Sequence, residues 1–359
     1  YGKTIDNLIE ADVLLSDSTE LHLEPLSDDA YAEKLKGDDL EGEIYQTVHR
    51  LRTDLRDEID SRYPKLQRRV SGYNLDEMIL PQPTNLAKLM AGAEGSLGLL
   101  TRAKVKLSDS PKAVGVCVVH VDDLIVGLKS VPFILEDAPF ALELVDSNII
   151  SNGRKYPALR GKLDWLQQQP DGLLGVEFDG ETDAEVKAKL DAFATRCQRQ
   201  KLGYAHVNLQ GQADINNVWE LRKAGLGLLM ATRSNAKAIA FLEDIAIPPE
   251  HVGDFIDEFR KYCRGVGKDI GLFGHAGVGQ IHSRPMLDLH EQHNVDLMLK
   301  MMNEVNEIVN RYGGCISGEH GDGIVRSWLI ERNFGPKLYQ GFRDLKKAFD
   351  PVGMMNPGK

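Results

Sequence analysis

After Leu107, short apolar runs alternate with segments whose apolar residues recur at helical spacing. This alternation limits the possible folds more than any other feature of the chain. Residues 114–121 and 173–178 have the apolar pattern of strands, whereas apolar residues spaced three and four apart over 186–197 are typical of a helix. No run is long enough for the doubly buried strands of a wound parallel sheet. The pattern therefore predicts an α+β fold, with split strand–helix–strand units on a largely antiparallel sheet flanked by helices.

The first 107 residues are organised differently. Residues 1–30 favour strands and turns, residues 42–61 carry apolar side chains at helical spacing, and a Gly-rich turn precedes an alternating strand near residue 100. The polar segment 108–112 is typical of a linker. Near the C-terminus, we expect a strand over 239–247 and a last helix that begins at Pro336.

The composition excludes several classes of partner and site. Lys and Arg total 43 against 54 Asp and Glu, a net charge of −11 without a basic block, so no nucleic acid is expected. The longest apolar stretch, residues 113–121, is too short to span a bilayer. The four cysteines form no CxxC pair, so we expect buried free thiols in a reducing, cytoplasmic compartment rather than a zinc ribbon or a disulfide.

Two Gly-rich segments carry the candidate chemistry. GHAGVGQIH places His275 and His282 on either side of a tight turn, from which both imidazoles can face one point. GEHGDG adds Glu319 and His320 in a segment with poor helix and strand propensity. Two histidines and Glu319 suit a catalytic Zn²⁺, or another divalent metal, with an open position, and leave His320 as an acid/base group. Unrelated surface histidines and a polar turn are the alternative.

Two arginines are candidates for binding a carboxylate. Arg222 in WELRKAG could form a bidentate fork, although a solvated helix arginine is equally compatible with the sequence. Arg284 lies two residues after His282, and residues two apart on a strand share a face. The Gly-rich turn of residues 92–98 could let a cofactor approach the backbone. It lacks the GxGxxG spacing and no helix follows it, so a Rossmann site is disfavoured.

Eight segments, in the same order as in the family, resemble the FAD-linked oxidases of the vanillyl-alcohol oxidase type. Closest in appearance are the D-2-hydroxyglutarate, D-lactate and glycolate dehydrogenases. The segments are YGKTIDNLIEADVLLSDSTEL, RRVSGYNLDEM, GAEGSLGLLTRAKVKL, WELR, FLEDIAIPPE, GHAGVGQIH, SGEHGDG and KKAFDPVGMMNPGK. The insertion at 41–69 and the form GHAGVGQIHSRPMLDL look most like the large branch, in which an iron–sulfur domain follows the NPGK segment.

The resemblance implies a fragment of a longer enzyme. Residues 1–107 would be the second half of an FAD-binding domain, with the helical insertion 41–69. Residues 108–330 would be the substrate, or cap, domain, and residues 331–359 a helix and NPGK segment that return to the flavin side. The pyrophosphate loop would precede the chain and the iron–sulfur cluster would follow it. We therefore expect the chain alone to hold no FAD and to be inactive.

The resemblance also assigns individual residues. His275, His282 and Glu319 fall on the metal ligands, His320 on the base and Arg222 on a carboxylate-binding arginine. The remaining flavin contacts are implied at Gly92, Glu94, Gly95, Gly98 and Asn356.

The sequence departs from the family pattern in two places. Val278 and Gln280 replace the Asp and Asn of the commoner GHxGDGNxH motif, and Gln280 can still donate an amide hydrogen bond to substrate. Leu242 stands where 2-hydroxyglutarate dehydrogenases use a lysine, and Arg284 is expected to compensate for the lost charge.

The implied function is FAD-dependent dehydrogenation of a D-2-hydroxy acid of the 2-hydroxyglutarate, lactate or glycolate class. The metal would lower the pKa of the substrate hydroxyl, His320 would accept its proton and the hydride would pass to flavin. An iron–sulfur domain or a membrane quinone would then take the electrons, with peripheral membrane association and a homodimer as further expectations. A metal-dependent hydrolase and a non-catalytic module that holds metal and binds a partner domain stay open as alternatives.

Overall fold

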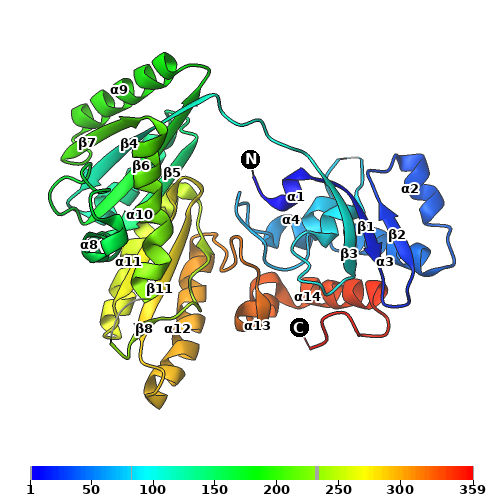
Figure 1. The fold of residues 1–359 in the computed structure, drawn as a ribbon. Helices are drawn as coiled ribbons and strands as arrows, with labels where there is room; N and C mark the ends of the chain where they lie inside the picture. Colours follow the sequence, from blue (N-terminus) through cyan, green and yellow to red (C-terminus); the bar gives the residue numbers. More distant parts are fainter. Residues whose placement is uncertain (1, 82, 231–233, 359) are drawn as a thin grey trace. The chain divides into compact units, whose positions relative to one another are not determined.

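The computed structural model describes residues 2–81, 83–230 and 234–358 and divides the chain into two compact units (Figure 1). Unit 1 consists of Tyr1–Ser108 and Ser317–Lys359, and unit 2 of Asp109–Ile316. The second boundary therefore comes earlier than residue 330, the position expected from the sequence. The reason is that residues 317–323 are hydrogen-bonded to the first part of unit 1 through Ser71 and Glu94.

Unit 1 is built on a three-stranded antiparallel sheet in the order β2-β1-β3. In chain order its elements are α1 (Thr4–Asn7), β1 (Leu8–Leu14), β2 (Glu20–Leu23), α2 (Asp28–Lys34), α3 (Leu40–Asp54), α4 (Arg56–Arg62), α5 (Leu75–Met78), η1 (Leu86–Met90), β3 (Leu99–Val105), α13 (Gly323–Arg326), η5 (Ser327–Leu329) and α14 (Ile330–Phe349). One apolar core joins β1 and β2 to α3 and α14, so the C-terminal helix is an integral part of this unit.

The helices of unit 1 follow the predicted periodicity with two interruptions. Ile44, Val48 and Ile59 are fully buried, as the spacing requires. The backbone of Leu55 is not helical, with φ −107° and ψ 12°, so the helix expected over 42–61 is the pair α3 and α4. In α14, Gly335 has a φ of 79° and interrupts the helix, which resumes at Pro336, where the sequence predicts a start.

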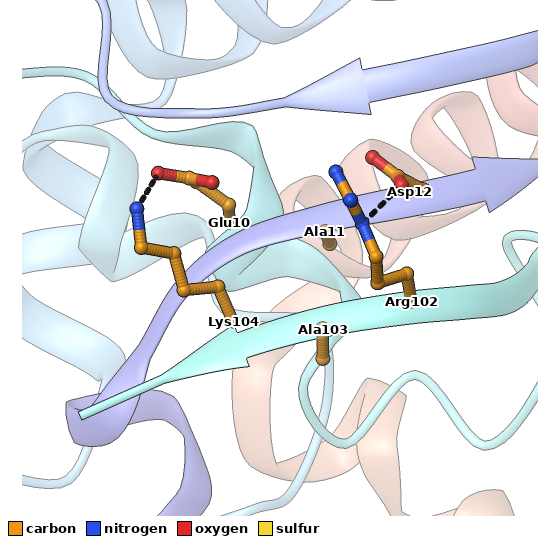
Figure 2. Close-up of a pocket in the computed structure, with 6 residues that line it drawn as sticks. All are labelled: Glu10, Ala11, Asp12, Arg102, Ala103 and Lys104. Atoms are coloured by element: carbon orange, nitrogen blue, oxygen red, sulfur yellow. Dashed lines mark hydrogen bonds and ion pairs between the residues drawn. The ribbon is translucent and has the colours of Figure 1, made fainter. Parts of the chain in front are cut away.

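The outer face of the unit 1 sheet is polar. Two cross-strand ion pairs lie beside a shallow hollow (Figure 2): Glu10 with Lys104, and Asp12 with Arg102, each at 2.6 Å. Ala11 lies between Glu10 and Asp12 on β1, so its side chain is on the other face of the sheet, where it is buried. Exposed pairs of this kind contribute about 0–1 kcal/mol each. The hollow is therefore a solvated sheet face rather than a built binding site.

Unit 2 contains an eight-stranded antiparallel sheet in the order β7-β4-β6-β5-β10-β11-β8, with β9 paired to β11. In chain order its elements are β4 (Ala113–Val121), α6 (Leu124–Lys129), α7 (Val131–Leu135), β5 (Ala141–Asp146), α8 (Ser147–Lys155), η2 (Pro157–Leu159), β6 (Gly172–Gly180), α9 (Asp183–Gln200), β7 (Ala205–Gln210), α10 (Gln212–Met230), β8 (Lys237–Ala238), β9 (Ile245–Ala246), η3 (Pro249–His251), α11 (Val252–Gly265), β10 (Ile270–His275), η4 (Ala276–Val278), β11 (Gln280–Leu287) and α12 (Gln292–Arg311). This antiparallel sheet with flanking helices confirms the predicted fold class.

Helices cover both faces of the unit 2 sheet. On one face, α8 and α10 share an apolar core with β4 and β5. The stripe of α9, which includes Phe193 and Cys197, is buried, and all four cysteines are free and buried as expected. In the part of the chain that the structure describes, no helix is both long enough and apolar enough to cross a membrane.

The strand expected over 239–247 is wrong in its extent. Only the two-residue strand β9 forms within that range, and the two-residue strand β8 ends just before it. Between them, two successive backbone carbonyls accept hydrogen bonds from a single residue of β11 instead of forming a regular ladder. The Ser283 side chain donates to Leu242 O at 2.6 Å, and the Ser283 backbone N–H donates to Glu243 O at 3.2 Å. The polar side chains of Glu243 and Asp244 also need partners, and a regular ladder would not bring them to Arg284 and Gln280.

Candidate active site

The hairpin of β10 and β11 positions the two predicted histidines. Its strands pair Phe273 with His282 and His275 with Gln280. Gly279 closes the turn with a φ of 68°, and a Cβ there would lie 1.7 Å from the backbone oxygen of Ile247. Only glycine fits both the positive φ and this close approach. The Gly-rich composition of the segment is therefore required by the turn.

The hairpin brings His275 and His282 together on one face of the sheet. Their ring centroids are 5.7 Å apart and the ring planes are 79° apart, an edge-to-face contact. Asp244, which is fully buried, places a carboxylate oxygen within 4.8 Å of a ring nitrogen of His282. Sequence reasoning missed Asp244. The available signal was an acidic pair inside the apolar segment FLEDIAIPP.

His275, Glu143 and Arg222 form a chain of hydrogen-bonded polar side chains. The Nδ1 of His275 donates to Glu143 Oε1 at 2.6 Å, and the other oxygen of Glu143 accepts from Arg222 Nε at 2.8 Å. The side chains of Glu143 and Arg222 are 15% and 14% exposed, so both charges are largely withdrawn from water. Sequence reasoning missed Glu143, because nothing in the strand pattern of residues 141–146 distinguishes it.

Arg284 and Gln280 are both buried beside the histidines. Arg284 forms an ion pair with Glu243, while its Nε is buried and has no hydrogen-bond partner among the residues that the structure describes. Gln280 is fully buried, and its Nε2 donates to Asp244 Oδ1 at 2.7 Å. The amide that is expected to bind substrate thus also donates a hydrogen bond to Asp244.

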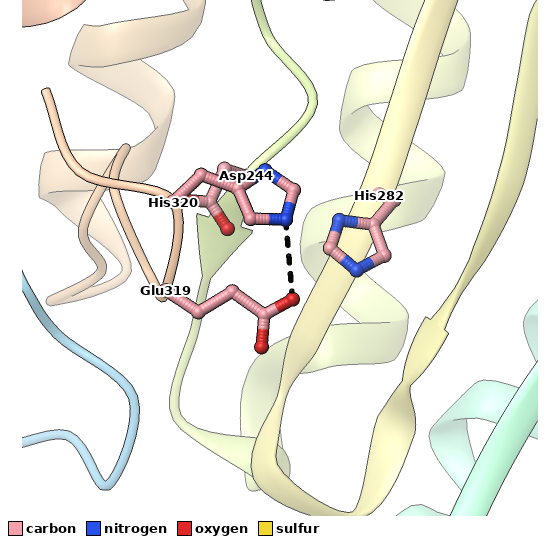
Figure 3. A group of neighbouring side chains, drawn as sticks. All are labelled: Asp244, His282, Glu319 and His320. Carbon is pink, nitrogen blue, oxygen red and sulfur yellow. Dashed lines mark ion pairs between the residues drawn. The ribbon is translucent and has the colours of Figure 1, made fainter. Parts of the chain in front are cut away.

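In unit 1, Glu319 and His320 lie on a loop that is held from two sides. His320 Nε2 is 3.3 Å from Glu319 Oε1 (Figure 3). Asp322 accepts from the side chain of Ser71 at 2.9 Å and from that of Ser317 at 2.6 Å. The Glu94 carboxylate accepts from the backbone N–H of Asp322 at 2.7 Å.

A pocket of about 270 Å³ in unit 1 collects several of the predicted cofactor residues. Gly92, Glu94, Glu319 and His320 line it, together with the cationic side chains of Lys3, Arg68 and Arg69. Burial lowers the pKa of Lys3, and the neighbouring Arg69 lowers it further. The Glu94 and Glu319 carboxylates line the same pocket and Arg69 pairs with Asp76 at 2.7 Å, so the lining carries charges of both signs.

The other predicted flavin contacts shape the turn beside this pocket. Asn356 Nδ2 donates to the backbone oxygen of Glu94 at 2.7 Å. Gly95 has a φ of 68° and no heavy atom within 4 Å of the position of a Cβ, so its backbone is open to a ligand. Gly98 has a different role, because a Cβ there would lie 2.6 Å from Val13. Gly98 lets the turn pack on the sheet.

Comparison with known proteins points to one family. The domain described as "FAD linked oxidases, C-terminal domain" matches residues 110–359. D-2-hydroxyglutarate dehydrogenases of Pantoea ananatis and Pseudomonas putida are 34% and 32% identical to the chain over its whole length. The chain spans 36% of the length of each of these two relatives.

A D-lactate dehydrogenase of Archaeoglobus fulgidus is 25% identical over 77% of the chain and 58% of its own length. Among solved structures, p-cresol methylhydroxylase with substrate bound aligns with a TM-score of 0.62 at 10% identity. This alignment covers 99% of the chain and 66% of that protein. At that identity, the structural match shows a shared fold alone.

Proposed function

This chain belongs to the family of FAD-linked oxidases, and on that premise we propose that it supplies the substrate and metal site of an FAD-dependent D-2-hydroxy-acid dehydrogenase. The observation that carries the proposal is the pair of imidazoles, His275 and His282, on one face of a hairpin. Relatives named D-2-hydroxyglutarate dehydrogenase match the chain from end to end, which favours a diacid substrate.

The donor set of the proposed metal site is His275, His282 and Glu319, with Zn²⁺ as the first choice. The two imidazoles are neighbours, with ring centroids 5.7 Å apart, and zinc bonds to imidazole nitrogens are about 2.0–2.1 Å long. Asp244 is a fourth candidate ligand because its carboxylate lies beside His282. A divalent metal, when bound, supplies a Lewis acid that lowers the pKa of a coordinated hydroxyl.

The Gly-rich turn of unit 1 fits one part of a flavin. The open backbone at Gly95, the pocket beside Gly92 and the cationic side chains that line it are suited to a planar group with an electron-rich edge. Asn356 and Glu94 would hold this turn in place. FAD, when bound, supplies the two-electron acceptor for the dehydrogenation.

The chain's own residues would orient the substrate and move its proton. The buried Nε of Arg284 is a donor without a partner in the described structure, so a carboxylate placed there would satisfy it. His320 would accept the hydroxyl proton, since imidazole titrates near neutral pH. The hydrogen bond that the backbone N–H of Asp322 donates to the Glu94 carboxylate would hold the loop, and with it His320, at a fixed position in the pocket. The electron acceptor, the localisation and the homodimer expected from the sequence stay predictions.

The test is oxidation of D-2-hydroxyglutarate, D-lactate and glycolate, with an artificial electron acceptor, by the FAD- and Zn²⁺-loaded protein that carries this chain. We expect His320→Gln to lower kcat by about 10²–10⁴-fold. Arg284→Met should raise KM by about 10–100-fold, the equivalent of roughly 1.5–3 kcal/mol of charge-assisted hydrogen bonding.

The matched control is Arg264→Met, which changes an exposed arginine near the end of α11 and should leave both constants unchanged. L-2-hydroxy acids serve as the substrate control. Failure to oxidise any of the three acids would contradict the proposed function. An unchanged KM in Arg284→Met would remove Arg284 from the substrate site without touching the rest of the proposal.

A further inference from the structure

The Glu143 carboxylate bridges two side chains from different parts of unit 2. Glu143 lies on β5, His275 at the end of β10 and Arg222 on α10. One carboxylate oxygen accepts from His275 Nδ1 at 2.6 Å and the other from Arg222 Nε at 2.8 Å. Each partner therefore occupies a separate oxygen, and the carboxylate cannot turn without losing one of the two bonds.

Strand register places Glu143 beside α10 and the hairpin. Its neighbour across the β5–β6 pair is Gly175, and the ring of Trp219 on α10 packs over that glycine. The next carboxylate on this sheet face, Glu177, accepts from Trp219 Nε1 at 3.1 Å and contacts no histidine. A carboxylate as withdrawn from water as Glu143 is costly unless both of its oxygens are bound.

The contact has a defined consequence for His275. A carboxylate only accepts hydrogen bonds, so the proton of a neutral imidazole must be on Nδ1, and the lone pair is then on Nε2. The short contact also fixes the rotation of the ring, which meets the ring of His282 at 79°. Metal-bound histidines in proteins commonly donate their second N–H to a carboxylate in this way.

We propose that Glu143 is a positioning residue that selects the Nε2-ligating tautomer of His275, and that Arg222 holds Glu143 in place through its Nε. This inference rests on the metal role of His275 in the proposed function. The guanidinium of Arg222 is centred 4.9 Å from the ring of Phe273, so it is held between that ring and the carboxylate.

The first experiment reads the tautomer without metal or substrate. The metal-free chain, with isotope-labelled histidine, is studied by nitrogen NMR at about pH 8.5, where free imidazole is neutral. We expect wild-type His275 to carry its proton on Nδ1, and Glu143→Leu to move it towards Nε2. Glu177→Gln, a change on the same sheet face, should leave the His275 signals unchanged. An unaltered tautomer in Glu143→Leu would overturn the proposal.

The second experiment measures Zn²⁺ affinity by competition with a chromophoric chelator. Glu143→Leu should weaken binding by about 10–100-fold. Arg222→Met should weaken it several-fold, and the double variant should be no weaker than Glu143→Leu, because residues that act through one another are not additive. Wild-type affinity in Arg222→Met would show that Arg222 does not hold Glu143 in place.

Folding and the metal proposal are controlled separately. Thermal melts check each variant, and Glu143→Leu combined with Arg222→Leu leaves no unpaired buried charge if the single change fails to fold. A wild-type chain that binds no Zn²⁺ would overturn the metal site itself. The tautomer experiment would still show whether Glu143 controls the His275 ring, so the two failures are distinguishable.

Discussion

At the scale of single residues, Lys346 and Asp350 hold the closing segment of unit 1. Lys346 Nζ donates to Ser96 O at 2.6 Å, to Met355 O at 2.7 Å and to the carboxylate of Asp350. The Asp350 side chain is fully buried. Burial by itself would raise the pKa of Asp350, but the hydrogen bonds from Lys346 and from the backbone of Met355 and Met354 lower it to about 2.

Asp350→Ala should therefore lower the free energy of unfolding by about 3 kcal/mol at pH 7, because Lys346 loses its buried partner. A lowered pKa contributes stability above the unfolded value of about 3.9, and this contribution is lost as the pH falls through about 2. The difference between variant and wild type should shrink over that range. Urea unfolding at several pH values measures it.

The control for this prediction is Asp344→Ala on α14, the helix whose C-cap is Asp350. Asp344 pairs with Arg50 at 2.8 Å on the surface, where an ion pair contributes about 1 kcal/mol or less. Equal losses in the two variants would show that the buried network around Asp350 adds nothing beyond an ordinary surface pair.

At the scale of elements, the turn between β10 and β11 decides whether the histidine pair forms. Gly279 has a φ of 68°, its N–H donates to Ala276 O at 3.0 Å and its carbonyl accepts from Ile247 N at 2.9 Å. We expect Gly279→Ala to displace the turn and to cost at least about 2 kcal/mol of unfolding free energy. Chemical denaturation measures the loss, and Zn²⁺ affinity should fall with it.

Gly265→Ala is the matched control for the turn. Gly265 ends α11 and has no heavy atom within 4 Å of the position of a Cβ. Alanine favours a helix over glycine by up to about 1 kcal/mol, so this variant should be as stable as the wild type or more stable. A Gly279→Ala protein with wild-type stability would mean that the turn does not constrain the hairpin.

At the scale of the whole molecule, unit 1 is built from two separate stretches of chain. Leu8, Val13 and Ile44 share one apolar core with Leu338 and Phe349. The segment between β3 and β4 is exposed, and Leu107 within it is 85% exposed. A trypsin cut after Lys106 should therefore leave two fragments that stay together through the core of unit 1.

Gel filtration after limited digestion checks this expectation. The cut fragments should elute together in native buffer and separate in denaturant, since apolar burial of this kind holds them without a covalent link. Lys106→Gln combined with Lys112→Gln should delay the first cut. Fragments that separate in native buffer would contradict the shared core.

Sequence reasoning succeeded where the signal was local. The spacing of Ile44, Val48 and Ile59 predicts a buried stripe, and the structure confirms it. Alternation on a strand and a Gly-rich turn place His275 and His282 on one side, as observed. It failed over 239–247, because there the polar side chains of Glu243 and Asp244 bind partners on another strand instead of forming a ladder of their own.

The fold class, the family and the two histidines can be predicted from the sequence, since periodicity and Gly-rich motifs are properties of neighbouring residues. The contacts of those histidines follow from the tertiary structure. Glu143 lies 132 residues from His275, and Asp244 lies 36 residues from Gln280. No local pattern marks an acidic residue for a partner that distant. The fold brings them together because a buried carboxylate must find a donor when the sheet closes around it.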